Sequence, residues 1–231
     1  MRLLATLASQ NVVEQIEETG RYRLGWRVLS YATAYQKANT LIQLSEAAVA
    51  QLAEMSGETC CLYVPAGSGR VVVLQVESPH ELRYAAQVGR VYPLYRGAAG
   101  KALLAHMPQA RIQRELDACG RDGGKESARR LSTDLTVIKA RGFAISSGEN
   151  IPGVCGIAVP IFGPAEVVVA SLSVYGPLGR LDDAALKRLT QPVLAAGTDI
   201  SRMLGERSVS LPDEAESDGA TAPRRSTARA R

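Results

Sequence analysis

The feature that most constrains the fold is a set of short apolar runs that come in two groups of three. The first group is TCCLYV, RVVVLQVES and ELRYAAQVG, and the second is FAISS, VCGIAVPIF and EVVVASLSVY. Runs of this length, bounded by turn signals such as PAGSG and FGPAE, are typical of β-strands. Because such short turns join neighbouring strands in space, they favour an antiparallel sheet.

Helical patterns surround both groups of strands. Apolar residues recur at intervals of three and four from Leu41 to Met55, and Gly57 is placed to end that helix. Further helices are predicted over GAAGKALLAHM, over residues 109–118, from Ser132 or Thr133 to Arg141, and from Asp182 or Asp183 to Leu204, with CGRDGGKES as a loop. This order predicts an α+β domain whose helices pack on one face of the sheet.

The first 25 residues predict a different kind of unit. Leucines at helical spacing precede a two-stranded hairpin that turns at Gly20, where a positive φ is easily adopted. A helix followed by a hairpin with outward basic residues suggests a winged helix-turn-helix, in which Arg2, Arg21 and Arg23 would contact DNA phosphates. A solvated charged strand fits the same residues and is the alternative. A helix over residues 26–37 then follows, and Asn39 or Thr40 would cap the next one.

Composition limits the function classes. The 231 residues carry a net charge of +4, part of which sits in TAPRRSTARAR, so bulk charge does not by itself indicate a nucleic-acid partner. The four cysteines form no CxxC and the chain has two histidines, so we expect no metal site and no cofactor. With neither a signal peptide nor a spanning apolar segment in the sequence, we expect a cytoplasmic protein with reduced thiols and no membrane partner.

Several blocks carry a family resemblance. RLLATLASQNVVEQIEETGRYRLGWRVLSYA resembles the end of the DNA-binding domain and the linker helix of IclR-type bacterial transcription regulators. YPLYRGAAGKALLA, VIKARGFAIS, GVCGIAVPIF and SLSVYGPLGRL resemble, in order, blocks of that family's effector-binding domain. The resemblance implies a partial winged helix-turn-helix over residues 1–25, a linker helix over 26–39 and a GAF-like effector-binding domain over 40–205. Residues 206–231 are predicted to form a disordered basic tail. Family members form dimers and often tetramers, so a homodimer or homotetramer is expected.

The resemblance also implies an effector site for a small organic acid. The candidate residues are Tyr84, Tyr92, Ala98, Ala99, Ser146, Gly156, Ser173 and Tyr175. Small residues in GAAGK would let a carboxylate approach backbone N–H groups at a helix start, although close helix packing selects the same residues. Small-acid-binding members can hold cysteine in place of Gly156 and serine in place of Tyr175. These two departures favour an aromatic or larger carboxylate over a two-carbon acid.

The predicted function is therefore an effector-responsive, DNA-binding transcriptional regulator. Met1 falls inside what should be the family's recognition helix, so we expect this polypeptide to bind DNA weakly compared with an upstream-extended version in a mobility-shift assay. The alternative is a headless effector-binding or dimerisation protein that titrates full-length relatives. An enzyme such as a GAF-type methionine-sulfoxide reductase would need a nucleophilic thiol with a resolving partner, and the cysteines show no such arrangement. We do not expect an enzyme.

Overall fold

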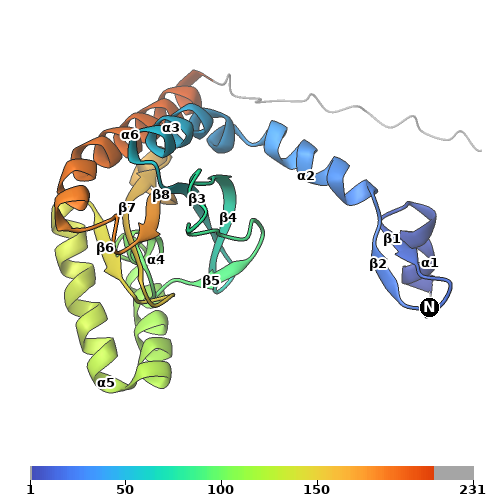
Figure 1. Cartoon of the computed structure of the whole chain (residues 1–231), viewed down its shortest axis with the longest axis horizontal. Helices are drawn as coiled ribbons and strands as arrows, with labels where there is room; N and C mark the ends of the chain where they lie inside the picture. Colours follow the sequence, from blue (N-terminus) through green and yellow to red (C-terminus); the bar gives the residue numbers. More distant parts are fainter. Residues whose placement is uncertain (1, 211–231) are drawn as a thin grey trace, which may run out of the picture.

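The computed structural model describes residues 2–210, which form a small N-terminal unit, an exposed connecting helix and a large α+β domain (Figure 1). The N-terminal unit comprises α1 (Arg2–Ser9), β1 (Val13–Gln15) and β2 (Tyr22–Leu24), and the two strands pair antiparallel. Gly20 turns the hairpin with a φ of 66°. Gly25 closes it against Asn11, two residues before β1, because a Cβ there would lie 2.2 Å from the Asn11 carbonyl oxygen. The predicted helix and hairpin are therefore confirmed.

Two consecutive helices connect this unit to the sheet. α2 (Arg27–Ala38) buries none of its residues, whereas α3 (Thr40–Ser56) packs on the large domain. Asn39 separates them, and its Oδ1 accepts a hydrogen bond of 3.2 Å from the Ile42 N–H, which caps α3 as predicted. Gly57 ends α3 in the left-handed conformation with a φ of 66°.

The large domain is built on one antiparallel sheet with the order β5-β4-β3-β8-β7-β6. Its strands are β3 (Thr59–Ala66), β4 (Gly69–Val76), β5 (Val91–Pro93), β6 (Ala144–Ser147), β7 (Val154–Phe162) and β8 (Val168–Pro177). A short 3₁₀ turn, η1 (Pro164–Glu166), joins β7 to β8 in the predicted hairpin. The predicted antiparallel sheet is confirmed.

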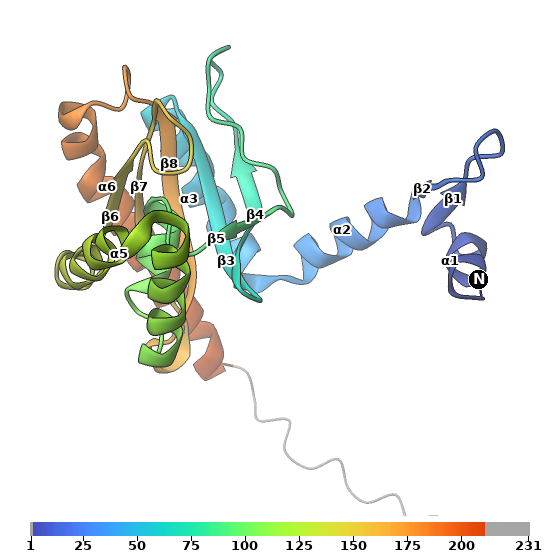
Figure 2. The same ribbon diagram turned by 90° about the horizontal axis from the view of Figure 1, so that it is seen from below.

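Helices cover both faces of the sheet, so the prediction of one covered face is wrong (Figure 2). α3 and α6 (Asp183–Ser210) pack on one face, and α4 (Ala98–Leu104) and α5 (Gln109–Arg141) pack on the other. The reason lies in the strands: Cys60 and Cys61 point to opposite faces, yet both are fully buried. Strands that are apolar on both sides need cover on both sides.

The stretch ELRYAAQVG does not form the predicted third strand. Residues 77–90 have no regular structure, and the strand that follows, β5, pairs only with Gly69–Val71 at the start of β4. The Ala86 N–H donates a hydrogen bond of 3.0 Å to the Gln75 side chain. In a β-strand this N–H would instead donate to a backbone carbonyl of the neighbouring strand. Residues 77–97 instead form a cover over one end of the sheet, which bears on the site below.

The break predicted at CGRDGGKES is present but much shorter than expected, because the helices on either side extend into this stretch and meet at Gly124. At Gly124, whose φ of 80° and ψ of 170° are not helical, the chain reverses direction, so α5 consists of two helices that lie side by side (Figure 1). A Cβ on Gly120, in the first of them, would lie 3.6 Å from the Ala128 Cβ in the second. Glu126 forms ion pairs with Arg129 and Arg130 at helical spacing, which supports the restart far ahead of the predicted caps at Ser132 and Thr133. Gly142 ends the helix as expected, with a φ of 81°.

The last helix begins where the sequence predicts, since the Asp182 Oδ1 accepts a hydrogen bond of 2.7 Å from the Ala185 N–H. It continues to Ser210, past the predicted start of the tail at residue 206. The rest of the predicted disordered tail lies outside the described residues. Within residues 2–210, no helix is both long enough and apolar enough to cross a membrane.

Candidate functional site

The predicted effector residues converge on the face of the sheet that α4 covers. The strand register pairs Gly156 with Tyr175 and with Ser146, and these three side-chain positions point towards α4. Ser173, Ala98 and Ala99 are fully buried on the same face. The sequence therefore identified a set of residues that are neighbours in space, although they come from five elements.

Tyr175 occupies the centre of this site. Its ring lies directly over Gly156, where a Cβ would come within 2.2 Å of the Tyr175 Cδ1. Its hydroxyl oxygen accepts a hydrogen bond of 2.9 Å from the Ala99 N–H. The backbone donor predicted to bind a ligand carboxylate is thus held by the protein's own phenol, and the ring fills the space around it. The approach to this N–H that the sequence predicts for a carboxylate is therefore closed in this structure.

Three further tyrosines surround Tyr175. The ring centroids of Tyr84 and Tyr63 lie 4.9 Å and 6.4 Å from that of Tyr175. The hydroxyl groups of Tyr63 and Tyr84 are 3.2 Å apart, and the half-buried Tyr92 packs edge-on against Tyr63. Burial raises the pKa of Tyr175 to about 12, so its phenol is neutral at physiological pH. We call these four residues the tyrosine cluster.

Arg70, at the start of β4, is buried beside the tyrosine cluster. It is 1% exposed, and its guanidinium carbon lies 5.2 Å from the ring centroid of Tyr63 and 5.7 Å from that of Tyr92. Its Nη1 donates to the Pro93 carbonyl oxygen. Its Nε has no hydrogen-bond partner. A buried cation in aromatic surroundings is the most unusual charge of this domain.

The glycines of GAAGK make room for this guanidinium. A Cβ on Gly100 would lie 2.4 Å from the Arg70 Nη1, and one on Gly97 would lie 3.3 Å from the Arg70 Nη2. Gly97 also has a φ of 77°, which disfavours any other residue. The small residues of this turn therefore serve close packing, the alternative that the sequence left open, and what they pack against is a charged group.

The two serine hydroxyl groups on β8 differ in their hydrogen bonding. The Ser173 Oγ donates a hydrogen bond of 3.1 Å to the Cys61 carbonyl oxygen, which is the local bonding that competes with a ligand role. The Ser171 Oγ is buried on the same face without a partner, opposite Tyr63 in the strand register. Ser146 is 5% exposed on β6. Ser171 is thus the hydroxyl on this strand that remains available to a ligand.

An ion cluster around the buried Lys101 anchors the other side of α4. The Lys101 Nζ contacts the carboxylates of Glu149 and Asp134, the latter at 3.0 Å. Glu149 also accepts a hydrogen bond of 2.9 Å from the Gly97 N–H. Its two oxygens are therefore committed to Lys101 and Gly97 and are not within salt-bridge distance of Arg70.

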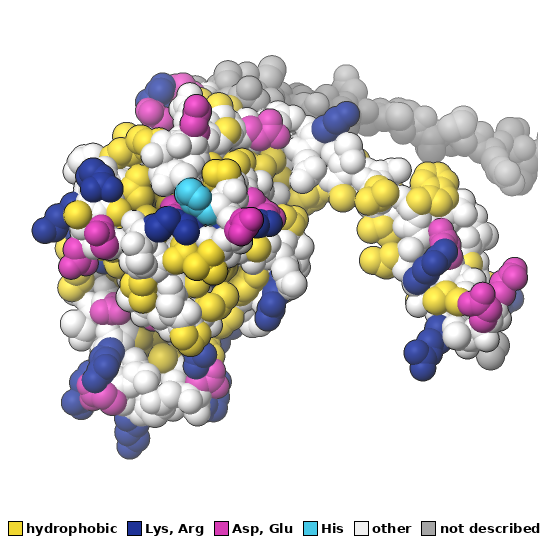
Figure 3. Space-filling view, in the orientation of Figure 1, with side chains coloured by type: hydrophobic (Ala, Val, Ile, Leu, Met, Phe, Trp, Pro, Cys, Tyr) yellow, Lys and Arg dark blue, Asp and Glu magenta, His cyan; other side chains and the backbone are white. Residues whose placement is uncertain are grey.

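The three predicted DNA-facing arginines are all exposed on the N-terminal unit. Arg23 pairs across the hairpin with Glu14, with 3.0 Å between the Arg23 Nε and the Glu14 Oε2. Arg2 lies at the start of α1, and Arg21 lies just before β2. Basic and acidic side chains are interspersed on the face of the unit seen in Figure 3. Arg23 already has an ion-pair partner on the neighbouring strand, as the alternative of a solvated charged strand predicts. Arg21 lies outside the strand, so that alternative fits it less well.

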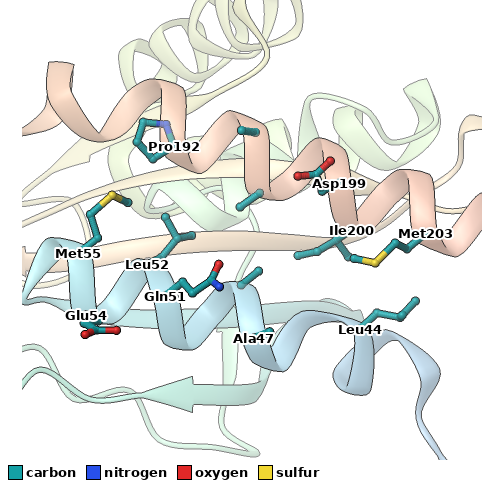
Figure 4. A pocket seen from close by; sticks show the side chains of 13 residues that line it. Leu44, Ala47, Gln51, Leu52, Glu54, Met55, Pro192, Asp199, Ile200 and Met203 are labelled. Carbon is teal, nitrogen blue, oxygen red and sulfur yellow. The ribbon is translucent and has the colours of Figure 1, made fainter.

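An apolar groove of about 730 Å³ runs between α3 and α6, on the opposite face of the domain (Figure 4). Leu44, Leu52 and Met55 line it from α3, and Pro192, Ile200 and Met203 line it from α6. Its walls are predominantly aliphatic, with Glu54 and Asp199 as the acidic residues. None of the predicted effector residues lines this groove.

All four cysteines are buried and free. Burial raises the pKa of the Cys60 thiol to about 12 and raises the pKa of Cys61, Cys119 and Cys155 as well. A nucleophilic cysteine needs a lowered pKa and access to solvent. The thiols are therefore unsuited to the sulfoxide-reductase chemistry considered above.

Arg70 and Tyr63 are the site residues that sequence reasoning missed. Arg70 is the first residue of the apolar run RVVVLQV and directly follows a turn. The local pattern therefore predicts that its side chain is exposed to solvent. A signal was present, because Arg70 shares its strand face with Val72 by the period of two. The Gly97 and Gly100 that accommodate it lie far along the chain, so its burial does not follow from the local pattern.

Comparisons with known proteins agree with this architecture. The family model described as "Bacterial transcriptional regulator IclR C-terminal" matches residues 33–202. The HTH-type transcriptional regulator BhcR of Paracoccus denitrificans is 30% identical over 87% of this chain and 73% of its own length. The glycerol operon regulatory protein of Streptomyces griseus is 31% identical over 88% and 82%.

Solved structures show the same fold. The crystal structure of an IclR transcriptional regulator from Alicyclobacillus acidocaldarius superposes with a TM-score of 0.77 at 24% identity, covering 88% of this chain and 84% of the other. Another structure, from Rhodococcus sp. and described as IclR-family, has a TM-score of 0.66 at 30% identity, with coverage of 89% and 79%.

Proposed function

Because the chain belongs to the IclR family of bacterial transcriptional regulators, we propose that it controls transcription by binding operator DNA, and that a small organic acid bound by its large domain modulates this binding. The observation that carries the proposal is the match of residues 33–202 to the family's C-terminal domain, joined here to a helix and basic hairpin. We further infer a cytoplasmic protein that is not an enzyme.

DNA contact is proposed for the N-terminal unit. Arg2, Arg21 and Arg23 would neutralise phosphates, which positions a protein on the duplex without reading its sequence. Arg23 must exchange its Glu14 partner for a phosphate, whereas Arg21 forms no ion pair within the described residues. Arg21 is therefore the hairpin residue expected to contribute most.

Assembly as a homodimer or homotetramer is proposed from the surfaces left exposed. α2 presents Leu29, Tyr31 and Tyr35, each more than half exposed, to solvent. Tyr31 and Tyr35 lie one turn apart and Leu29 lies on the other side of the helix, so apolar side chains are exposed around α2, as is typical of an interaction surface. Two copies joined along α2 would bring two N-terminal units together, which suits operators with two half-sites.

The effector is proposed to bind where Tyr84, Tyr92, Ala98, Ala99, Ser146, Gly156, Ser173 and Tyr175 meet. Since Tyr175 holds the Ala99 N–H in this structure, a ligand must displace the phenol before its carboxylate can accept that hydrogen bond. Binding is thereby tied to a conformational change, which an allosteric regulator requires.

A mobility-shift assay tests the proposal. The protein is titrated onto duplex DNA that flanks its own gene, with and without an aromatic acid, against a scrambled duplex as control. Preferential retardation of the flanking DNA that changes with the acid supports the regulator. Retardation of both duplexes alike, insensitive to acid, contradicts it. A protein that lowers retardation by a full-length relative without shifting DNA itself would instead support the titrating role.

A further inference from the structure

Arg70 differs from every other buried charge in the described part of the chain. Four charged residues are buried there: Glu58, Arg70, Lys101 and Glu115. Glu58 pairs with Arg180, Lys101 with Asp134 and Glu149, and Glu115 with Arg111. Within residues 2–210, no carboxylate lies within 4.0 Å of the Arg70 guanidinium. A buried charge without a counter-charge is strongly unfavourable, so this one calls for a compensating anion.

The neighbouring groups do not supply that anion. Cation–π contacts with Tyr63 and Tyr92 offset only part of the cost of burying a guanidinium. The Pro93 carbonyl satisfies one of its five N–H groups, and the Nε–H is left without a partner. The Tyr175 hydroxyl oxygen accepts the hydrogen bond that a ligand carboxylate would accept, but the phenol is neutral and cannot balance the charge of Arg70.

From these contacts we propose that Arg70 is the anchor of a buried binding site for an aromatic carboxylate, whose ring replaces that of Tyr175. This rests on the proposed function, because it assigns the chemistry of the effector site. The carboxylate accepts from the Arg70 guanidinium, which packs against Gly97 and Gly100, and from the N–H of Ala99, which lies between those two glycines in the chain. The ring of the acid stacks among the remaining tyrosines of the cluster.

Tyr175 marks the outline of such a ligand. It places an aromatic ring 4.9 Å from Tyr84 and 6.4 Å from Tyr63, and it carries an oxygen that accepts from the Ala99 N–H. A carboxylate on a ring of the same size would add the negative charge that the phenol lacks. The Ser171 Oγ, buried without a partner opposite Tyr63, is a further donor for a polar substituent.

Entry requires the cover formed by residues 77–97 to move, because Arg70 and Tyr175 are both buried. This segment supplies Tyr84 and Tyr92 and has only the three residues of β5 in regular structure between β4 and α4. A side-chain hydrogen bond from Thr59 to the Tyr84 carbonyl oxygen ties it to β3. The ligand is therefore enclosed once bound, and its carboxylate meets Arg70 in a desolvated site where the interaction is strongest.

The test compares thermal unfolding of the full chain with benzoate and with benzamide, which has the same shape without the charge. Benzoate at a concentration about 100-fold above its Kd is expected to raise the Tm by about 5–10 °C. Benzamide and acetate at the same concentration are expected to leave it unchanged. An equal shift with acetate or inorganic phosphate would show a general anion site and overturn the aromatic assignment.

Variants then locate the anchor. Arg70→Met is expected to weaken benzoate binding by about tenfold or more, while Arg90→Met, which removes an exposed arginine stacked on Tyr92, is the matched control. Without ligand, Arg70→Met is expected to unfold at or above the wild-type temperature, since it removes an uncompensated charge. Arg70→Lys, which keeps the charge but loses the bidentate fork, is expected to bind benzoate more weakly than wild type.

Three further outcomes overturn the inference. Benzoate binding that Arg70→Met leaves intact shows that the carboxylate sits elsewhere. A large fall in the ligand-free Tm of both Arg70 variants shows a structural role for the guanidinium. Failure of benzoate, 4-hydroxybenzoate and phenylacetate to shift the wild-type Tm removes the aromatic-acid class. In each case the ligand-free protein's preference for the flanking duplex over the scrambled one still tests DNA binding, so that part of the regulator proposal is judged separately.

Discussion

The contact between Gly156 and Tyr175 leads to a prediction that can be worked through quantitatively. A Cβ on Gly156 would lie 2.2 Å and 2.3 Å from two ring carbons of Tyr175, far inside van der Waals contact. The ring cannot move aside freely, because it is 3% exposed and packed against Tyr63 and Tyr84. Overpacking of this kind costs about 1–3 kcal/mol. For a chain of this size, Gly156→Ala is thus expected to lower the Tm by about 2–12 °C.

A double-mutant cycle isolates the cause. Tyr175→Ser alone removes a buried ring and is expected to cost about 3–5 kcal/mol, as large-to-small aromatic substitutions do. In the double variant the alanine methyl group enters space that the ring has vacated. The double variant should therefore be less destabilised than the sum of the single variants, by about 1–3 kcal/mol. Urea unfolding at constant temperature measures all four proteins.

The control for this cycle is Gly179→Ala, at an exposed position where a Cβ meets nothing within 4 Å. If Gly156→Ala is no less stable than Gly179→Ala, or if the cycle shows no coupling, the placement of the Tyr175 ring over Gly156 is wrong. The steric contact explains why a tyrosine at position 175 needs a glycine at position 156 opposite it.

Three further predictions rest on single residues. Burial, reinforced by Lys139, lowers the pKa of His106, so the folded state keeps the imidazole neutral while the unfolded chain takes up a proton. Stability should therefore fall as the pH drops through the ordinary histidine pKa of about 6.5, less steeply in His106→Gln, as followed by Tm. Equal pH dependence of the two proteins would contradict this. Arg21→Ala should reduce the slope of log affinity against log salt for a mixed-sequence duplex by about one, measured by fluorescence anisotropy, and an unchanged slope would remove Arg21 from the interface. Because burial raises the pKa of Cys60 to about 12, the native thiols should react with an aromatic disulfide reagent far more slowly than the urea-unfolded chain, and rapid native reaction would show an accessible cysteine.

The sequence predicts the elements of this fold well wherever the determinants are local. Asn39, Gly57 and Gly142 mark helix ends by their own side-chain or backbone chemistry, and each lies where predicted. The chain reversal at Gly124 lies inside the predicted loop, but that loop is far shorter than its several glycines and charges suggest. The ion pairs of Glu126 with the following arginines keep the segment helical up to a single non-helical residue. Composition alone does not distinguish these outcomes.

In the site, too, the sequence predicts some features and not others. The residues carried over from the family resemblance do converge, because strand register and the small residues of α4 bring their positions together. What the sequence did not indicate is that Tyr175 would fill the space itself, or that Arg70 would lie buried beneath α4. Both facts depend on contacts between elements that are distant in sequence. A charged residue at the start of a strand is far more often solvated than buried.

In the proposed regulator, the position of Tyr175 determines how occupancy of the site would reach the DNA-binding unit. Tyr175 pairs in the strand register with Thr59, the first residue of β3, which begins three residues after α3 ends at Ser56. The Thr59 side chain also bonds the Tyr84 carbonyl oxygen of the cover. A ligand that expels the Tyr175 ring and lifts the cover therefore acts on both neighbours of Thr59 at once. The opposite end of α3 meets α2 at Asn39, so a shift of α3 redirects the helix that carries the hairpin. Only the difference in ligand affinity between the two arrangements can drive that shift, and the uncompensated charge of Arg70 provides such a difference, because it is neutralised in one arrangement and not in the other.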